Sequence, residues 1–304
     1  MKFSLVIPVA PYRDAEILKS INELDFPRKD YEIILEKGLN TSKNRNEGFK
    51  KSKGKIIVFL DDDAVVDKNL LKNAEKFFKK YSEIDIVGGP QLTPLDEKGF
   101  AKVSGYALSS KFGGWNTSNR YGKKESSLNA DETVLTSALL FCKKEVMKKI
   151  KFDESLWPGE DPKFIADCKR AGFKVAYNPD LIIYHRRRTT MKGLAKQIFN
   201  YGKVGPFREK FSETIKKPFF LIPCFFVLYL FFFCIIFLIG LSNSVLVLPL
   251  FVYLIMDIDF SIYEGIKNRN ASSILLLMII FPLIHLSYGI GRIFGYFKKF
   301  LIKN

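Results

Sequence analysis

Cysteine is scarce in this sequence. Only 4 of the 304 residues are cysteines, and no two of them have the Cys-x-x-Cys spacing of a zinc or redox site. Cys224 and Cys234 lie inside a long apolar run, and all four are interpreted as small hydrophobic residues rather than as disulfides or zinc ligands. The sequence also has no internal repeat and no nucleic-acid-binding motif, so we expect no nucleic-acid partner.

Charged residues are absent from Pro218–Gly240. As a helix this segment would be about 34 Å long, enough to cross the apolar core of a bilayer. Ser272–Ile290 is the next candidate span. Val245–Met256 is apolar but short and runs into Asp257, so it is compatible with a short span, a re-entrant hairpin or an interfacial helix. The sequence therefore predicts two to three spans in a multi-pass membrane protein.

Acidic residues are outnumbered by basic ones, and the formal net charge is +16. An anionic membrane surface is the simplest explanation, because many basic residues flank the apolar segments. A polyanionic substrate and a lysine-rich composition without a specific partner are the alternatives. The flanking lysines are Lys210, Lys216, Lys217, Lys298, Lys299 and Lys303.

Short apolar segments alternate with amphipathic ones near the start of the chain. Because strands that alternate with helices form parallel sheets, this order predicts an α/β fold. Met1–Ala10 is interpreted as holding a strand rather than a signal peptide, since Pro8 interrupts it and no A-x-A site follows. The predicted strands are Phe3–Val9, Tyr31–Leu35, Ile56–Leu60, Ile84–Val87, Glu132–Cys142, Lys174–Tyr177 and Leu181–Tyr184, and the predicted helices are Ala15–Leu24, Ser42–Ser52, Lys68–Tyr81, Asp161–Ala171 and Met191–Asn200.

Two domains are expected on this basis. Residues 1–212 would form an α/β domain, and residues 213–304 would form the membrane region. The stretch of about 191–212 begins as an amphipathic helix, which can lie in the membrane interface or pack on the α/β domain.

Three consecutive aspartates, Asp61, Asp62 and Asp63, follow the predicted strand Ile56–Leu60. Ligands of open α/β sheets bind at the carboxyl ends of the strands, and clustered carboxylates suit Mg²⁺ or Mn²⁺. A metal-diphosphate site is therefore one interpretation. A solvated acidic turn or a helix N-cap is the alternative, because Asp is a good capping residue.

Several short motifs in a fixed order resemble a known family. Together they resemble family-2 glycosyltransferases of the inverting GT-A type with a C-terminal membrane region, similar to transferases of cell-surface polysaccharide and glycolipid assembly. The resemblance implies a Rossmann-like, mostly parallel sheet and covers nearly the whole chain. The motifs are Ser4–Val9, Asn44–Gly48, Phe59–Asp63, Val87–Pro90, Trp157–Asp161 and Tyr184–Arg186.

The resemblance assigns roles to the acidic residues. It implies that Asp63 binds Mn²⁺ or Mg²⁺, and that Asp61 contacts the ribose or a metal-bound water. His185 is either a further metal ligand or a structural histidine. Asp62 belongs to the same nucleotide-sugar motif, but side chains alternate in an extended segment, so we expect it to point away and to tolerate substitution best.

Inversion requires a general base that removes the proton from the acceptor hydroxyl. The resemblance implies that Asp161 is this base, that Glu160 helps to bind the acceptor, and that Trp157 stacks on an acceptor sugar. Without the family pattern, Glu160 and Asp161 would be interpreted as caps of the helix that follows, and Trp157 as a core residue.

The nucleotide pocket departs from the commoner family pattern, which has Asp-Asp-Gly-Ser after the second strand. Here that strand ends in Glu36-Lys37-Gly38. The resemblance implies nucleotide contacts from Pro8, Glu36 and Arg45, whereas a surface glutamate and a packing arginine are the alternatives.

The acceptor side rests on the resemblance as well. Arg186, at the head of a run of three arginines, can bind a phosphate or flank the membrane. Gln197 is the matching position of Gln-x-x-Arg-Trp in processive relatives, but the Arg and Trp are missing, which favours a non-processive enzyme. Membrane attachment favours a polyprenyl-linked or glycolipid acceptor. Because sugar nucleotides are cytoplasmic, we expect the catalytic domain to face the cytoplasm. A processive synthase and a non-catalytic scaffold are the alternatives.

Overall fold

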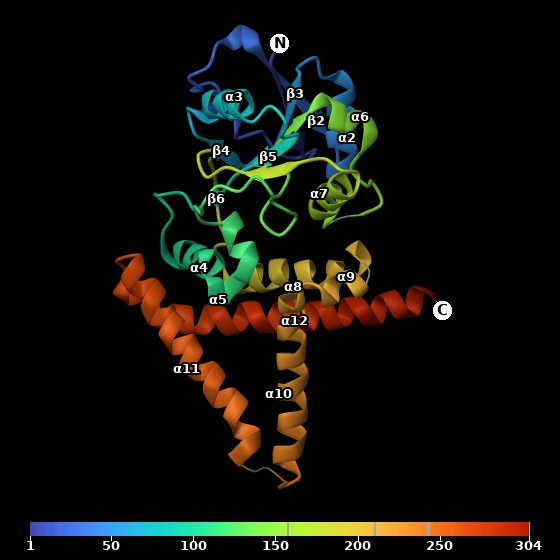
Figure 1. The fold of residues 1–304 in the computed structure, drawn as a ribbon. Coiled ribbons are helices and arrows are strands. Elements are labelled where there is room, and N and C mark those ends of the chain that lie inside the picture. The colour runs from blue at the N-terminus through green and yellow to red at the C-terminus, as the bar shows by residue number, and fades with distance from the viewer. Residues whose placement is uncertain (157, 210, 242–243, 304) are drawn as a thin grey trace. The chain divides into compact units, whose positions relative to one another are not determined.

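The computed structural model describes residues 1–304 with the exception of 157, 210, 242, 243 and 304 (Figure 1). The chain divides into two compact units. The first comprises Met1–Glu97 and Asn116–Arg186, and the second comprises Lys98–Trp115 and Arg187–Asn304. The first unit contains all the strands of the described residues, and the second is helical.

The main sheet of the first unit is mostly parallel, as predicted. Its six strands have the order β2-β1-β3-β7-β5-β8. β1 is parallel to both β2 and β3, and β5 is parallel to β8, whereas β7 runs antiparallel to its neighbours β3 and β5. The strands are β1 (Phe3–Val9), β2 (Tyr31–Lys37), β3 (Ile56–Leu60), β5 (Ile86–Gly88), β7 (Leu139–Lys143) and β8 (Val175–Tyr177).

Helices cover both faces of this sheet because the strands are apolar on both sides. Leu5 and Ile7 of β1 belong to one apolar cluster and Val6 to the other. The first cluster takes in α1 (Leu18–Ile21) and α3 (Leu70–Lys80), and the second takes in α6 (Lys144–Lys149) and α7 (Glu160–Arg170). Phe49 of α2 (Thr41–Lys51) packs against the second cluster.

A second, small sheet lies directly after the aspartates. It has the order β4-β9-β6, with β4 at Ala64–Val66, β9 at Ile183–His185 and β6 at Gln91–Leu92. β9 is antiparallel to β4, and Ala64 pairs with His185. This register places His185, the last residue of β9, beside Ala64, the residue that follows Asp63.

Most predicted elements agree with the structure to within one or two residues at each end, but three differ more strongly in extent. Ala15–Leu24 contains only the four-residue α1, because turns at both ends replace regular helix. Glu132–Cys142 is extended only from Leu139, since the backbone of Val134 and Leu135 bonds back to Asp131 in a turn. Met191–Asn200 is the first part of a longer helix, α8, that continues to Arg208.

The second unit contains the apolar helices. Among the described residues, three segments are long and apolar enough to cross a membrane: Pro218–Leu238, Ser244–Lys267 and Ala271–Ile302. Val245–Met256, which seemed short in the sequence, is part of a 24-residue helix. The helices of this unit are α4 (Gly99–Ser109), α5 (Lys111–Gly114), α8 (Met191–Arg208), α9 (Phe211–Ile215), α10 (Ile222–Leu238), α11 (Ser244–Lys267) and α12 (Ile274–Lys303). Short 3-10 helices lie at Arg28–Asp30, Trp115–Arg120, Pro218–Phe220 and Ala271–Ser273.

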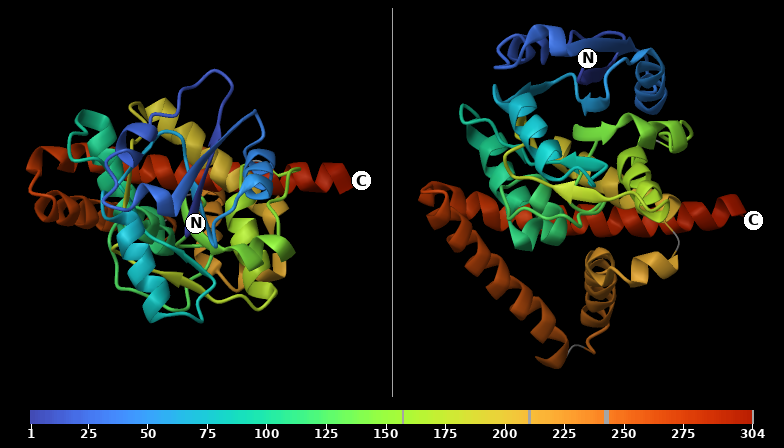
Figure 2. Two further views of the ribbon diagram at one scale, coloured as in Figure 1. Left: turned by 90° about the horizontal axis from the view of Figure 1, so that it is seen from above. Right: turned by 45° about the horizontal axis from the view of Figure 1, so that its top comes forward.

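Figures 1 and 2 show how the helices of the second unit are arranged. α8 lies beside α12, whereas α10 and α11 extend away from α12.

Candidate functional site

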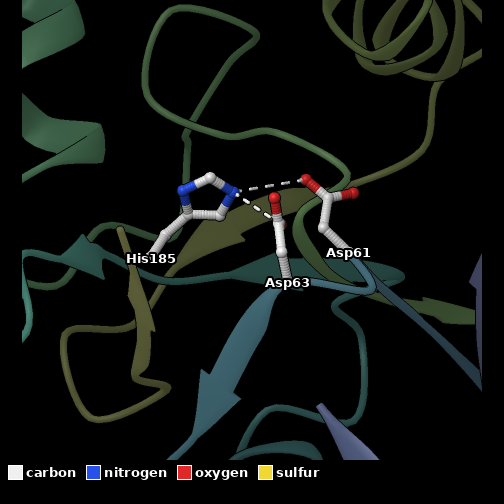
Figure 3. Close-up of side chains that lie close together, drawn as sticks. All are labelled: Asp61, Asp63 and His185. Carbon is white, nitrogen blue, oxygen red and sulfur yellow. Dashed lines mark ion pairs between the residues drawn. The ribbon is translucent and has the colours of Figure 1, made fainter. Parts of the chain in front are cut away.

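The carboxylates of Asp61 and Asp63 meet the imidazole of His185 at the carboxyl end of β3 (Figure 3). His185 Nε2 lies 3.1 Å from Asp63 Oδ1 and 4.0 Å from Asp61 Oδ2. The antiparallel pairing of β4 and β9 causes this convergence, because it places the last residue of β9 beside the aspartates. One ligand atom from each residue lies within 4.8 Å of the others, so the three can hold one metal ion.

The hydrogen bond of the other ring nitrogen of His185, Nδ1, determines whether Nε2 of the neutral ring carries a proton or a lone pair. Nδ1 lies 3.1 Å from the carbonyl oxygen of Arg186, and a carbonyl can only accept a hydrogen bond. Nδ1 therefore carries a proton and donates it to this bond. In the neutral ring, the lone pair then lies on Nε2 and faces the carboxylates, which is the tautomer that binds a metal.

The electrostatics of the two aspartates differ. Burial would raise the pKa of Asp63, but a protonated His185, which donates from Nε2 and carries a positive charge when no metal is bound, outweighs burial together with Arg13 and lowers that pKa to about 2. Burial raises the pKa of Asp61, although Arg45 and His185 oppose it. Two carboxylates and one imidazole nitrogen form a ligand set that fits Mn²⁺ or a similar divalent ion.

Arg45 connects Asp61 with the start of α7. Its guanidinium is 4% exposed, and Nη1 donates to Glu160 Oε1 at 2.9 Å while Nη2 donates to Asp61 Oδ1 at 3.2 Å. The same guanidinium lies over the ring of Phe152, 5.3 Å from its centroid. The arginine is thus fixed between two carboxylates of the candidate site.

Replacing Arg45 with Met is expected to destabilise the first unit by about 3–5 kcal/mol, because the buried carboxylate of Glu160 would lose its charged partner. Thermal melting of the purified protein in detergent measures the effect, and Lys50→Met, which removes an exposed lysine, is the matched control. An unchanged melting temperature in the Arg45 variant would contradict this interpretation.

Asp161 lies in the first turn of α7, next to this network. The N-cap position is taken by Gly159, whose φ of 107° is in the left-handed region that favours glycine. Neither Glu160 nor Asp161 is therefore the N-cap residue that the alternative interpretation required. Burial and the charge of Glu160 raise the pKa of Asp161 to about 6, although Arg120 and Arg45 act in the opposite direction.

Asp62 is the most buried of the three aspartates. Its side chain is 10% exposed, compared with 31% for Asp61 and 40% for Asp63. It is not part of the Asp61, Asp63 and His185 cluster, and its carboxylate contacts Arg13 at 3.4 Å and accepts a hydrogen bond from the backbone of Ala10. These contacts favour a structural role for Asp62, whereas the sequence predicts that it tolerates substitution best, and thermal melting of Asp62 variants distinguishes the two.

Replacing Asp62 with Ala is expected to cost about 1–3 kcal/mol, since Arg13 and the backbone N–H of Ala10 lose a charged acceptor. A domain of this size would melt about 2–12 °C lower. Asp62→Asn retains an acceptor oxygen, so its melting temperature is expected to lie between those of the Ala variant and the wild-type protein. If the Ala variant melted at the wild-type temperature, Asp62 would have no such role.

The other predicted residues are distributed as follows. Pro8 of β1 pairs in register with Glu36 of β2, and the carboxylate of Glu36 lies 2.7 Å from Lys51 Nζ. Arg186 is exposed and forms ion pairs with Asp96 and Glu97. Gln197, on α8 of the second unit, donates to the hydroxyl of Tyr201. Trp157 lies outside the described residues.

Two arginines of this region were missed by the sequence interpretation. Arg13 contacts both Asp62 and Asp63 at 3.4 Å. Arg120 donates to the carbonyls of Glu132 and Thr133, and its charge lowers the pKa of Asp161. Arg13 lies in an irregular segment and Arg120 at the end of a short 3-10 helix, each about 40 or more residues away from its carboxylate partner along the chain, so no local pattern could have indicated them.

Comparisons with known proteins identify the family. The family described as glycosyltransferase-like family 2 matches residues 2–200. A curated relative from Methanococcus voltae is 24% identical over 92% of this chain and 90% of its own length, and is named dolichyl N-acetyl-alpha-D-glucosaminyl phosphate 3-beta-D-2,3-diacetamido-2,3-dideoxy-beta-D-glucuronosyltransferase. The minor teichoic acid biosynthesis protein GgaB of Bacillus subtilis is 34% identical over 41% of this chain, which spans only 13% of that protein.

A solved structure supports the fold. A mannosyltransferase of Pyrobaculum calidifontis, in complex with GDP-Man and Mn²⁺, has a TM-score of 0.64 and 13% identity, over 98% of this chain and 88% of that one. At this identity the likeness concerns the fold alone. Since the family match extends over more than half of the sequence, this chain belongs to glycosyltransferase family 2, with a GT-A fold followed by a C-terminal membrane region.

Proposed function

We propose that this protein is a metal-dependent, inverting glycosyltransferase that moves a sugar from a nucleotide-sugar to a lipid-linked acceptor at the cytoplasmic face of the membrane. The observation that carries the proposal is the convergence of Asp61, Asp63 and His185 beside the Arg45–Glu160 pair and Asp161. Here a set of possible metal ligands and a carboxylate with a raised pKa come together from three separate parts of the chain. A metal-dependent, inverting sugar transfer uses both.

Asp63, Asp61 and the Nε2 atom of His185 would hold Mn²⁺ or Mg²⁺. Such an ion neutralises the charge that develops on a diphosphate leaving group. Arg45 keeps the carboxylate of Asp61 in place, and the hydrogen bond from Nδ1 to the carbonyl of Arg186 keeps the imidazole in place. The relative of known structure was obtained with GDP-Man and Mn²⁺, which supports this donor class and this type of ion.

Asp161 would act as the general base. Its carboxylate takes the proton of the acceptor hydroxyl while that oxygen attacks the anomeric carbon. The bond between the anomeric carbon and the diphosphate oxygen breaks on the opposite face, so the configuration inverts and a nucleoside diphosphate leaves. A pKa of about 6 leaves Asp161 mostly ionised at neutral pH and still basic enough to accept the proton.

The acceptor follows from the membrane region and from the named relatives. The Methanococcus relative is named for a dolichyl phosphate-linked sugar, and the Bacillus relative for teichoic acid biosynthesis. Both names support an acceptor of cell-surface glycoconjugate assembly, and the apolar helices support a lipid-linked one. The missing Arg and Trp after Gln197 support addition of one sugar or a few rather than processive synthesis.

The test is a panel of nucleotide-sugars with lipid-linked acceptors in detergent, scored by nucleotide release with Mn²⁺, with Mg²⁺ and with a chelator. We expect turnover with at least one donor, its loss with the chelator, and its recovery when the ion is added back. Turnover that is insensitive to the chelator would exclude the metal, and a retained anomeric configuration in the product would exclude Asp161 as the base for inversion.

A further inference from the structure

We infer that α12 does not cross the membrane. Instead, α10 and α11 cross as a hairpin, and α12 lies along the surface of the bilayer on the same side as α8, with one apolar face in the lipid. This rests on the membrane attachment included in the proposed function, but it does not depend on the reaction. All the contacts that carry it lie within the second unit.

The first observation is the extent of contact between α12 and segments that precede the apolar helices. Near its start, α12 contacts α5: His285 Nε2 donates to the carbonyl of Phe112 at 2.8 Å, and the rings of Phe112 and Phe281 are 5.1 Å apart. Near its end, Lys299 Nζ donates to the carbonyl of Pro206 in α8. From Phe281 to Lys299 the helix advances by about 27 Å, nearly the thickness of a bilayer core.

Between these ends α12 and α8 are in close backbone contact. A Cβ atom at Gly202 of α8 would overlap the carbonyl of Tyr288, and one at Gly291 or Gly295 of α12 would overlap a carbonyl of α8. Because the two helices stay in contact over several turns, they must lie at the same depth relative to the bilayer. α8 carries Lys192, Lys196, Lys203 and Arg208, which cannot all be placed in hydrocarbon, so α12 does not leave the surface either.

Arg292, near the middle of the contact with α8, indicates the depth of α12 in the membrane. It is fully buried, and Nη2 donates to Glu209 Oε1 at 2.7 Å and to Thr214 Oγ1 at 3.0 Å. Both partners lie between α8 and Pro218, where the first apolar segment begins. A residue in the middle of a span would lie deep in the hydrocarbon, whereas this arginine lies where the chain enters it.

The exposed apolar side chains of α12 lie mainly on one face. Exposed side chains recur at the spacing of one helix face, and α12 has more buried residues than the other two segments. In its apolar stretch 33% of the residues are buried, compared with 6% in Pro218–Leu238 and 11% in Ser244–Lys267. A helix with one face on protein and one in lipid is typical of an interfacial helix. The exposed large apolar residues of α12 are Leu275, Ile279, Ile290, Phe294, Phe297, Phe300, Leu301 and Ile302, and all but Ile302 fall on this face.

The distribution of charge agrees with this arrangement. If α10 and α11 cross as a hairpin, the basic residues before α10, after α11 and at the end of α12 share one side of the membrane. The connection at residues 239–243 would lie on the other side, and it has no charged residue. Three crossings would instead place Lys298 and Lys299 on the outer side, against the positive-inside rule. The residues on the shared side are Lys216, Lys217, Lys267, Arg269, Lys298 and Lys299.

Cysteine labelling in cells tests the side of each segment. In a variant whose four cysteines are replaced, single cysteines are introduced at Ile302, at Leu241 in the hairpin connection, and at the exposed Glu145 of the first unit. An impermeant maleimide is added to sealed and to permeabilised cells. We expect Ile302→Cys to react together with Glu145→Cys, and Leu241→Cys to react from the opposite side. Reaction of Ile302→Cys together with Leu241→Cys would overturn the inference, and so would reaction of all three from one side.

Spin labels along α12 give a second measurement, which does not require knowing which side of the membrane each residue faces. Cysteines at Leu275, Ile279, Ile290, Phe294 and Phe297 are labelled in liposomes, and their depth is read from accessibility to oxygen and to a water-soluble nickel complex. An interfacial helix predicts similar depths at all five positions. A crossing helix predicts a deep centre and shallow ends, which would overturn the inference. An inactive protein that gave the expected labelling would contradict only the proposed function.

Discussion

Asp161→Asn is expected to lower the rate of sugar transfer by about 10²–10⁴-fold, because an amide cannot accept the proton of the acceptor hydroxyl. Donor affinity is expected to change little, since the substitution retains the shape of the side chain. Initial rates of nucleotide release with acceptor present measure the first effect, and calorimetric titration with the donor measures the second. Asp25→Asn, which alters an exposed ion pair with Lys72, is the control. Wild-type transfer by the Asp161 variant would remove Asp161 from the mechanism.

The pH dependence distinguishes a base from a structural carboxylate. Because the base must be ionised, transfer is expected to rise with pH through about 6 and to be lost below it. The stability of the folded protein is expected to depend on pH in the opposite direction to the transfer rate. The folded protein holds this proton up to a higher pH than the unfolded chain, so the contribution of Asp161 to stability is present at low pH and is lost as the pH rises through about 6. At pH 7.5, Asp161→Asn should therefore melt at the wild-type temperature or above it, although it is inactive.

Asp63→Asn is expected to weaken Mn²⁺ binding and to lower transfer by about 10³-fold or more, because loss of a metal ligand removes several kcal/mol of charge stabilisation at the leaving group. Titration with Mn²⁺ followed by electron paramagnetic resonance measures binding independently of activity. Asp25→Asn again serves as the control. Wild-type Mn²⁺ affinity in the Asp63 variant would show that the ion binds elsewhere.

The strands and their order were largely predictable from the sequence. β3 is a run of five apolar residues at the predicted position, and the alternation of strands and helices indicated a mostly parallel sheet. These are local patterns, in which period and residue type decide the structure. The antiparallel strand β7 breaks the parallel order, and its direction depends on a pairing between residues about 80 positions apart, which periodicity does not encode.

The candidate site was predictable only in part. The aspartates and Asp161 were found through motifs, but the motif left His185 with two interpretations. It is the pairing of β4 with β9 that brings its Nε2 to 3.1 Å from Asp63. Likewise Arg45 was predicted as a nucleotide contact, whereas the structure has its guanidinium between Glu160 and Asp61.

What the sequence by itself determined is therefore the kind of molecule: a parallel α/β domain with acidic residues after a buried strand, followed by uncharged segments long enough for a membrane. Only the tertiary structure decided which side chains meet at the site and which apolar segment packs on α8. The physical reason is that hydrophobic period and composition act within about 20 neighbouring residues. Contacts such as Asp63 with His185 and Glu209 with Arg292 depend on strand register and helix packing between distant parts of the chain.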